Sequence, residues 1–188
     1  MQTAPLTGGF ENPPIDAARA FRSAMQALAR PGQIERIEGA TPPAPLSPAA
    51  GALALTLCDG DTPVWLASSH DTAAVRNWVT FQTGAPFVPR AGAMFAIGTW
   101  EALLPLDGYA LGTPEFPDRS ATLIAELGQL EPAGARLEGP GIRDTARLSL
   151  PDTDVLQKNA ALFPLGLDFF FTCGDRIAGL PRTTRVLG

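Results

Sequence analysis

The sequence predicts an α/β fold with three layers, in which a mixed β-sheet is flanked by helices. Segments with helical spacing of apolar residues are interspersed with short strand-like segments along the chain. The clearest strand, residues 167–173, is followed by Gly174-Asp175, a typical two-residue hairpin loop, and by a second strand at residues 176–180. No convincing linker divides the 188 residues, so one domain is expected over residues 1–188.

The first predicted helix begins at Asp16, its expected cap, and ends near Ala29, just before Pro31-Gly32. Apolar residues at helical spacing form the stripe that is expected to face the core: Ala17, Phe21, Ala24, Met25 and Leu28. The opposite side carries Arg19, Arg22, Gln26 and Arg30. We interpret this side as a solvated face, and a surface for an acidic partner is the alternative.

Three further helices are expected. One has Ser47 as its cap and Pro48 at its first position, and it ends near Cys58. The next spans about 72–83 and is followed by Gly84; its expected inward-facing residues are Ala74, Val75, Trp78, Val79 and Phe81. The last spans about 154–162 and is ended by Pro164.

The remaining strands are expected at residues 64–66, 93–97, 121–126, 135–138 and 143–148. Within the strand at 167–173, alternation predicts one face with Leu167, Phe169, Phe171 and Cys173 and another with Asp168, Phe170 and Thr172. Cys173 is therefore interpreted as a core residue, because a reactive thiol needs a cationic or helix N-terminal setting.

The composition argues against several classes of function. The chain has 19 acidic and 14 basic residues, a net charge of −5, so binding of nucleic acid is not expected. One histidine and two cysteines cannot build a Cys/His zinc site within one chain, and no metal site is predicted. The longest apolar stretch, residues 49–58, is too short to cross a bilayer, and the N-terminal residues lack a signal-peptide pattern. A cytoplasmic protein without membrane contact is therefore expected.

Two carboxylates are candidates for a buried polar site. Asp168 is flanked by Leu167 and Phe169 in a strand that is expected to be central, so its charge needs a partner. A structural hydrogen bond is favoured over catalysis there. Asp61 precedes the strand at 64–66, in a turn whose Asp, Gly and Pro residues require no function.

The C-terminal run Arg182-Thr183-Thr184-Arg185 has the groups that hold phosphate, guanidinium forks and hydroxyls. In an extended backbone, however, Arg182 and Thr184 would face one way, and Thr183 and Arg185 the other. Only one Arg–Thr couple could reach a given ligand. A surface tail or a subunit contact explains the run equally well.

Two other residues are candidates for catalysis. His70 follows Ser68-Ser69, so a Ser–His pair is conceivable, although neighbours in sequence rarely form such a dyad. Lys158 is the only lysine and so the only residue that could form a Schiff base with pyridoxal phosphate. It falls on a predicted helix, where an exposed position is the default. No catalytic residue is therefore assigned.

Several motifs, in a fixed order, carry a family resemblance. The run 163–184, FPLGLDFFFTCGDRIAGLPRTT, closely resembles the C-terminal signature of the PhnH family, the H subunits of the bacterial carbon–phosphorus lyase system. Residues 61–66, DTPVWL, look like its central motif. The N-terminal helix with Pro31-Gly32 is similar as well, and weaker matches between them are Thr83-Gly84-Ala85-Pro86, Ala121-Thr122-Leu123-Ile124 and Gly139-Pro140-Gly141-Ile142. Together they span about residues 10–186.

The resemblance implies a fold like that of pyridoxal-phosphate transferases, without a bound cofactor. It implies a homodimer that joins the G, I and J subunits. It also implies a role in forming α-D-ribose 1-methylphosphonate 5-triphosphate from ATP and methylphosphonate, with no accepted catalytic residue in this subunit. The three Trp and ten Phe agree equally well with a location of all of them in the core and with an apolar subunit contact, and the resemblance favours the contact.

Two alternatives from other classes stay open. One is a stand-alone phosphate- or nucleotide-binding module that uses Arg182 and Thr184. The other is a degenerate pyridoxal-phosphate enzyme, suggested only by the analogy of folds and dependent on Lys158.

Overall fold

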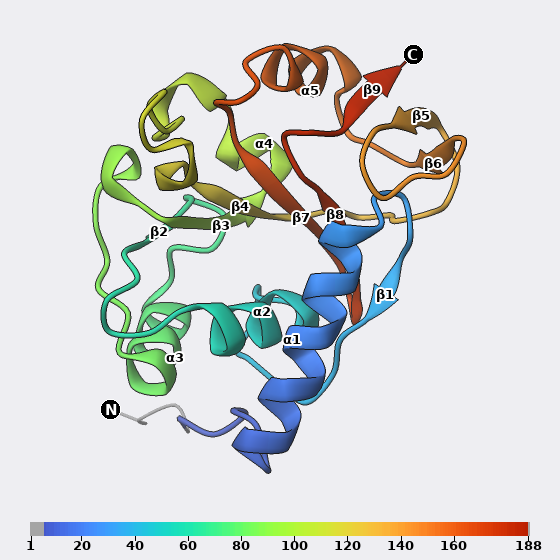
Figure 1. Ribbon diagram of the computed structural model, residues 1–188. Coiled ribbons are helices and arrows are strands. Elements are labelled where there is room, and N and C mark those ends of the chain that lie inside the picture. Colours follow the sequence, from blue (N-terminus) through green and yellow to red (C-terminus); the bar gives the residue numbers. More distant parts are fainter. Residues whose placement is uncertain (1–5, 188) are drawn as a thin grey trace.

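A six-stranded mixed sheet forms the centre of the molecule in the computed structural model, which describes residues 6–187 (Figure 1). Its strands, in spatial order, are β1 (Glu35–Arg36), β8 (Arg176–Leu180), β7 (Asp168–Cys173), β4 (Thr122–Glu126), β3 (Phe95–Thr99) and β2 (Val64–Leu66). The four strands from β7 to β2 run parallel, whereas β8 is antiparallel to both β7 and β1. The mixed sheet predicted from the sequence is confirmed.

Helices and a small second sheet cover the two faces. One face carries α1 (Pro13–Ala29), α2 (Pro48–Leu57) and α3 (Ala73–Thr83). The other carries α4 (Trp100–Leu103), α5 (Thr153–Ala160) and a three-stranded sheet of β5 (Ala135–Glu138), β6 (Ala146–Leu148) and β9 (Arg185–Leu187). Single 3-10 turns occur at Arg90–Gly92, Leu106–Gly108 and Pro117–Arg119. Two apolar clusters, one on each face, therefore sandwich the central sheet.

The alternation predicted for β7 is confirmed. Phe170 packs with the helices α1 to α3, while Phe169 and Phe171 point to the opposite cluster and pack around Trp100. Cys173 lies half-buried at the end of the same row. Gly174, at a φ of +62°, makes the predicted turn into β8.

The helix ends predicted for α2 and α3 are confirmed. The Ser47 hydroxyl accepts a hydrogen bond from the backbone N–H of Ala50, and Thr72 does the same for Val75. Gly84 ends α3 in the left-handed region. The boundaries of the other predicted elements agree within three residues, and α4, β1 and β9 were not predicted.

The predicted start and buried face of α1 are both corrected. The helix begins at Pro13, and Asp16 is not its cap but accepts a hydrogen bond from the backbone N–H of Asn12. Its buried residues are the alanines Ala20, Ala24 and Ala27, of which Ala24 was predicted to face the core. Phe21 and Met25, which were expected in the core, are 50% and 51% exposed.

The reason for this difference is the closeness of α1 to β8. A Cβ atom built on Gly179 of β8 would lie 2.6 Å from the carbonyl group of Ala27. Only small side chains fit such a contact, so the alanine face packs inward and the larger residues stay outside. Phe81 of α3 was likewise expected inside and is 61% exposed, while Val75, Trp78 and Val79 are buried as predicted.

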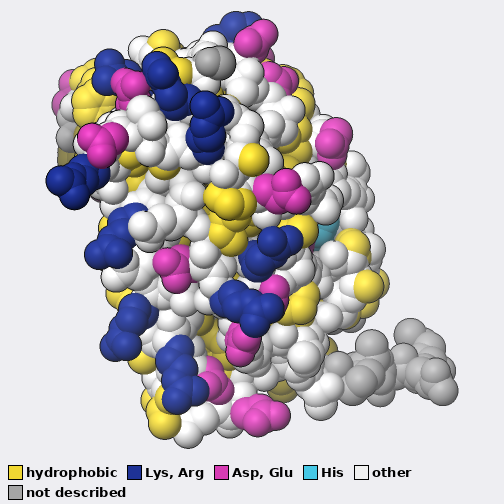
Figure 2. Space-filling view, turned by 90° about the vertical axis from the view of Figure 1, so that its right-hand side faces the viewer, with side chains coloured by type: hydrophobic (Ala, Val, Ile, Leu, Met, Phe, Trp, Pro, Cys, Tyr) yellow, Lys and Arg dark blue, Asp and Glu magenta, His cyan; other side chains and the backbone are white. Residues whose placement is uncertain are grey.

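Basic side chains run along the face formed by α1, β1 and the small sheet, with carboxylates among them (Figure 2). Several are paired: Arg36 lies 3.2 Å from Asp175, and both Arg136 and Arg185 contact Glu138. These exposed pairs neutralise much of the local charge. Among the described residues, no helix combines the length and the hydropathy that a membrane span requires.

Candidate functional site

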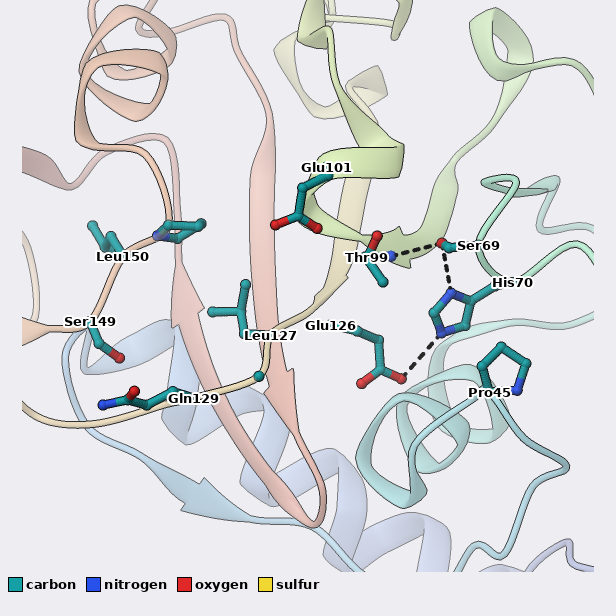
Figure 3. A pocket seen from close by; sticks show the side chains of 12 residues that line it. Pro45, Ser69, His70, Thr99, Glu101, Glu126, Leu127, Gln129, Ser149 and Leu150 are labelled. Carbon is teal, nitrogen blue, oxygen red and sulfur yellow. Dashed lines mark hydrogen bonds and ion pairs between the residues drawn. The ribbon is translucent and has the colours of Figure 1, made fainter.

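A cavity of about 660 Å³ opens at the carboxyl ends of the parallel strands β2, β3 and β4 (Figure 3). Ser69 and His70 follow β2, Thr99 ends β3, and Glu126 ends β4. Glu101 and Gln129 add further polar groups to the wall. Ligands of parallel α/β sheets bind at this end of the strands, and the volume is in the range of small-molecule sites.

A chain of hydrogen bonds fixes the orientation of His70. The backbone N–H of Thr99 donates to Ser69 Oγ at 3.0 Å, and Ser69 Oγ lies 3.0 Å from His70 Nδ1. Ser69 Oγ therefore links the end of β3 to the imidazole ring of His70.

His70 Nε2 points toward Glu126. The distance from Nε2 to Glu126 Oε1 is 3.6 Å, and buried Nε2 has no hydrogen-bond partner among residues 6–187. The backbone N–H of Ser47 donates to the same Oε1 at 2.7 Å. The second carboxylate oxygen is turned away from His70 into the cavity (Figure 3).

Glu126 is held as a carboxylate. Burial alone would raise the pKa of its side chain, but the His70 imidazole and the Ser47 N–H outweigh burial and lower the pKa below its usual value. Glu101 brings a second carboxylate to the wall, and the described lining contains no lysine or arginine. These two carboxylates therefore favour a negative electrostatic potential in the cavity.

Gly98 of β3 makes the close approach behind this site possible. A Cβ atom at this position would lie 2.5 Å from the Cβ of Ala67 and 3.3 Å from Ser69 Oγ. The absence of a side chain lets the segment after β2 pack directly on β3, which brings Ser69 within reach of the Thr99 N–H.

Asp168 lies at the opposite ends of the strands and has the partner that the sequence required. The Arg182 backbone N–H donates to Asp168 Oδ1 at 2.8 Å, and the Arg182 guanidinium bonds both carboxylate oxygens. The same guanidinium also donates to the Pro117 carbonyl at 2.6 Å and to the Ser120 hydroxyl. Arg182 thus joins the start of β7 to the segment that leads into β4.

The other residues of the predicted phosphate site are dispersed around it. The segment is a turn, closed by a 2.9 Å hydrogen bond from the Thr184 N–H to the Pro181 carbonyl, and not an extended strand. Thr184 is buried, Thr183 is exposed, and Arg185 contacts Glu138 on β5. The structure brings only Arg182 and Asp168 together.

The structure corrects the pairing of Asp61 with Asp168 in one buried polar site. Asp61 is exposed in the turn before β2, and its backbone N–H donates to Asp59. Strands β3 and β4 lie between β2 and β7, so the two aspartates belong to different regions. The turn itself was predicted.

The remaining candidates differ in their surroundings. Lys158 is exposed on α5, outside the lining of the cavity at β2–β4. Cys58 is buried, and burial raises the pKa of its thiol to about 12, so it is not a thiolate near neutral pH. Within residues 6–187, no three His, Cys, Asp or Glu side chains are grouped as metal ligands.

Sequence reasoning disfavoured a catalytic Ser–His pair at His70; the structure shows a hydrogen bond between the Ser69 and His70 side chains. Sequence reasoning missed Glu126 and Thr99 entirely. The only available signal was position, since Glu126 ends the strand predicted at 121–126 and Thr99 follows the strand predicted at 93–97 by two residues. Their proximity to His70 depends on the order of strands in the sheet, which the sequence pattern does not reveal.

Comparisons with known proteins cover nearly the whole chain. A family model described as bacterial phosphonate metabolism protein (PhnH) matches residues 8–187. The chain is 42% identical over 194 residues to the alpha-D-ribose 1-methylphosphonate 5-triphosphate synthase subunit PhnH of Rhizobium meliloti (strain 1021), covering 98% of this chain and 97% of that protein. It is also 35% identical over 82 residues to HtxG of Stutzerimonas stutzeri, provisionally named a C-P lyase subunit, covering 40% of this chain and 42% of that protein. With a match of this extent, the chain belongs to the PhnH family of bacterial phosphonate metabolism proteins.

Proposed function

We propose that this chain is the H subunit of an α-D-ribose 1-methylphosphonate 5-triphosphate synthase in the cytoplasmic carbon–phosphorus lyase system. The observation that carries the proposal is the 42% identity with the Rhizobium meliloti subunit over almost the full length of both chains. The partners that follow from this role are the G, I and J proteins and a second copy of this chain.

The test is co-expression with the G, I and J proteins of the same organism, using an affinity tag on the I protein. We expect this chain to co-purify in a fixed ratio to the tagged protein. Recovery of a G–I–J assembly that never contains it contradicts the proposal. Growth supplies a second measurement: deletion of the gene should abolish growth on methylphosphonate as the sole phosphorus source and leave growth on inorganic phosphate unchanged.

The alternative of a stand-alone phosphate-binding module has less support. Its central residue, Arg182, uses its guanidinium for Asp168, Ser120 and the Pro117 carbonyl. To bind Arg182, a phosphate would have to displace the Asp168 carboxylate, which already accepts hydrogen bonds from the backbone N–H and the guanidinium of Arg182.

We also propose that the fold is related to that of pyridoxal-phosphate transferases, without their cofactor chemistry. Four adjacent parallel strands with helices packed on the sheet support the relation. Lys158, the one residue able to form a Schiff base, lies on the solvent side of α5 and outside the cavity at β2–β4. Addition of pyridoxal phosphate should therefore give no imine absorption band that depends on Lys158.

A further inference from the structure

We propose that the cavity at the carboxyl ends of β2, β3 and β4 binds a small organic cation, a primary amine whose ammonium group lies against Glu126. The proposal goes beyond the role of a subunit and does not rest on it. It follows from the charge of the wall, from the position of Glu126 beside His70, and from the shape and polarity of the remaining lining.

The charge on the cavity wall indicates whether a ligand should be a cation or an anion. Glu101 and Glu126 both line the cavity together with His70, and no lysine or arginine stands among its lining residues. The hydrogen bonds of Ser69 with Thr99 and with His70 orient the imidazole ring so that Nε2 faces Glu126. A phosphate or a carboxylate would meet two like charges here, and an ammonium group would meet two opposite ones.

The second observation is the unmet hydrogen bonding around His70 and Glu126. His70 is 98% buried, yet its Nε2 lies 3.6 Å from Glu126 Oε1 and has no hydrogen-bond partner in the described structure. Among residues 6–187, the only donor at hydrogen-bond distance from Glu126 is the Ser47 N–H, on Oε1. The other oxygen faces the open cavity and can accept from a ligand (Figure 3).

The remaining wall accommodates the carbon body of an amine. Pro45, Leu127 and Leu150 supply apolar surface, and Gln129 offers an amide beside it. A metal ion is a poorer occupant, because no three potential ligand side chains are grouped among residues 6–187. An organic cation satisfies both the carboxylate and the apolar wall.

The experiment is a titration of the full-length ¹⁵N-labelled chain with four small probes, followed by amide chemical shifts at neutral pH and constant ionic strength. Ethanolamine, ethylene glycol and glycolate share a hydroxyl-bearing two-carbon frame and differ in charge. Methylphosphonate is the fourth probe. We expect saturable shifts at Ser69, Thr99 and Glu126 with ethanolamine, binding of ethylene glycol at least tenfold weaker, and no saturable shift with either anion.

Two variants locate the charge that is recognised. Glu126→Gln keeps an acceptor for the Ser47 N–H and should weaken ethanolamine binding at least tenfold, without changing the response to ethylene glycol. Glu101→Gln alters an exposed side chain that folding does not need, and we expect at least threefold weaker binding. Glu115→Gln is the matched control, because it makes the same change of charge on an exposed side chain outside the cavity.

Three outcomes overturn the proposal: no saturable shift with ethanolamine, equal or tighter binding of glycolate or methylphosphonate, or unchanged ethanolamine binding in both cavity variants. If Glu126→Gln does not give a dispersed spectrum, the Glu101→Gln variant decides alone. None of these results depends on co-purification with the G, I and J proteins, so failure of this inference and failure of the subunit role are distinguishable.

Discussion

Two half-buried carboxylates, Asp168 and Glu126, lie at opposite ends of neighbouring parallel strands and are stabilised in different ways. Asp168 accepts hydrogen bonds from the backbone and guanidinium of Arg182. Glu126 has the His70 imidazole and one backbone N–H beside it. Both oxygens of Asp168 accept hydrogen bonds, so this carboxylate has a structural role. Glu126 leaves one oxygen exposed to a cavity.

Asp168→Asn should destabilise the protein. The substitution removes the charge that the Arg182 guanidinium faces, and the side chains are only 23% and 12% exposed. Loss of one partner of a largely buried pair costs on the order of 2–4 kcal/mol of unfolding free energy. Urea unfolding of the wild type and of Asp168→Asn measures this loss of free energy. Asp71→Asn breaks the exposed pair with Arg76 and should cost less than about 1 kcal/mol; equal midpoints for the two variants would contradict the structural role.

Glu126 should make stability depend on pH in a defined direction. Its pKa in the folded protein is lowered from 4.5, so the unfolded chain binds the proton more tightly. The stabilisation is therefore fully present above about pH 4.5 and is lost as the pH falls through the lower, folded pKa. We expect the difference in unfolding free energy between wild type and Glu126→Gln to shrink below this pH.

Urea unfolding over a range of acidic pH values measures that difference. Glu115→Gln, at an exposed carboxylate, supplies the control and should give a difference that stays nearly flat. A wild-type advantage that grows as the pH falls would show that burial, and not the His70 and Ser47 contacts, governs this carboxylate.

Among the elements, α1 shows how close packing decides which side of a helix is buried. Its alanines lie against β8 and α2, and Gly179 of β8 approaches the Ala27 backbone closely. The larger apolar residues Phe21 and Met25 are left on the outer side of the helix. Helical periodicity therefore identified an apolar face but not the face that the sheet accepts.

Gly179→Ala tests this packing. The new Cβ atom would lie 2.6 Å from the Ala27 backbone, which cannot move unless α1 shifts as a whole. Overpacking of this kind costs about 1–3 kcal/mol, measurable as a lower urea midpoint. Gly128→Ala adds the same atom where nothing lies within 4 Å, and its midpoint should stay close to wild type. Matching midpoints in the two variants would argue against a tight α1–β8 contact.

Over the whole molecule, exposed apolar side chains occur on several surfaces. Phe21 and Met25 form a continuous strip on α1 together with Pro14 and Ala18, whereas Phe81 stands alone on α3. A strip of this kind is a better contact surface than a single exposed ring.

We expect the isolated chain to sediment as a homodimer at low micromolar concentration, with the α1 strip in the contact. The double variant Phe21→Ser/Met25→Ser should then sediment as a monomer with an unchanged circular dichroism spectrum, since neither side chain is in the core. Phe81→Ser removes a more exposed ring and should remain dimeric. A wild-type monomer, or a double variant that still dimerises, refutes this prediction.

The sequence by itself determined the elements whose signals are local. Alternation placed Phe169 and Phe171 on one face of β7, Gly174 specified the turn into β8, and Ser47 fixed the start of α2. Each of these signals acts within a few residues, so no knowledge of distant neighbours was needed. The family motifs are of the same kind, since they are read along the chain.

Only the tertiary structure decided which face of α1 is buried and where a ligand could bind. The contact from Thr99 to Ser69 joins residues 30 positions apart, and the contact from Ser47 to Glu126 joins residues 79 apart. These residues meet because β2, β3 and β4 are adjacent and parallel, an order that periodicity does not encode. Side-chain size at Gly179 likewise matters only once α1 lies on it, so both outcomes depend on packing between segments that are remote in sequence.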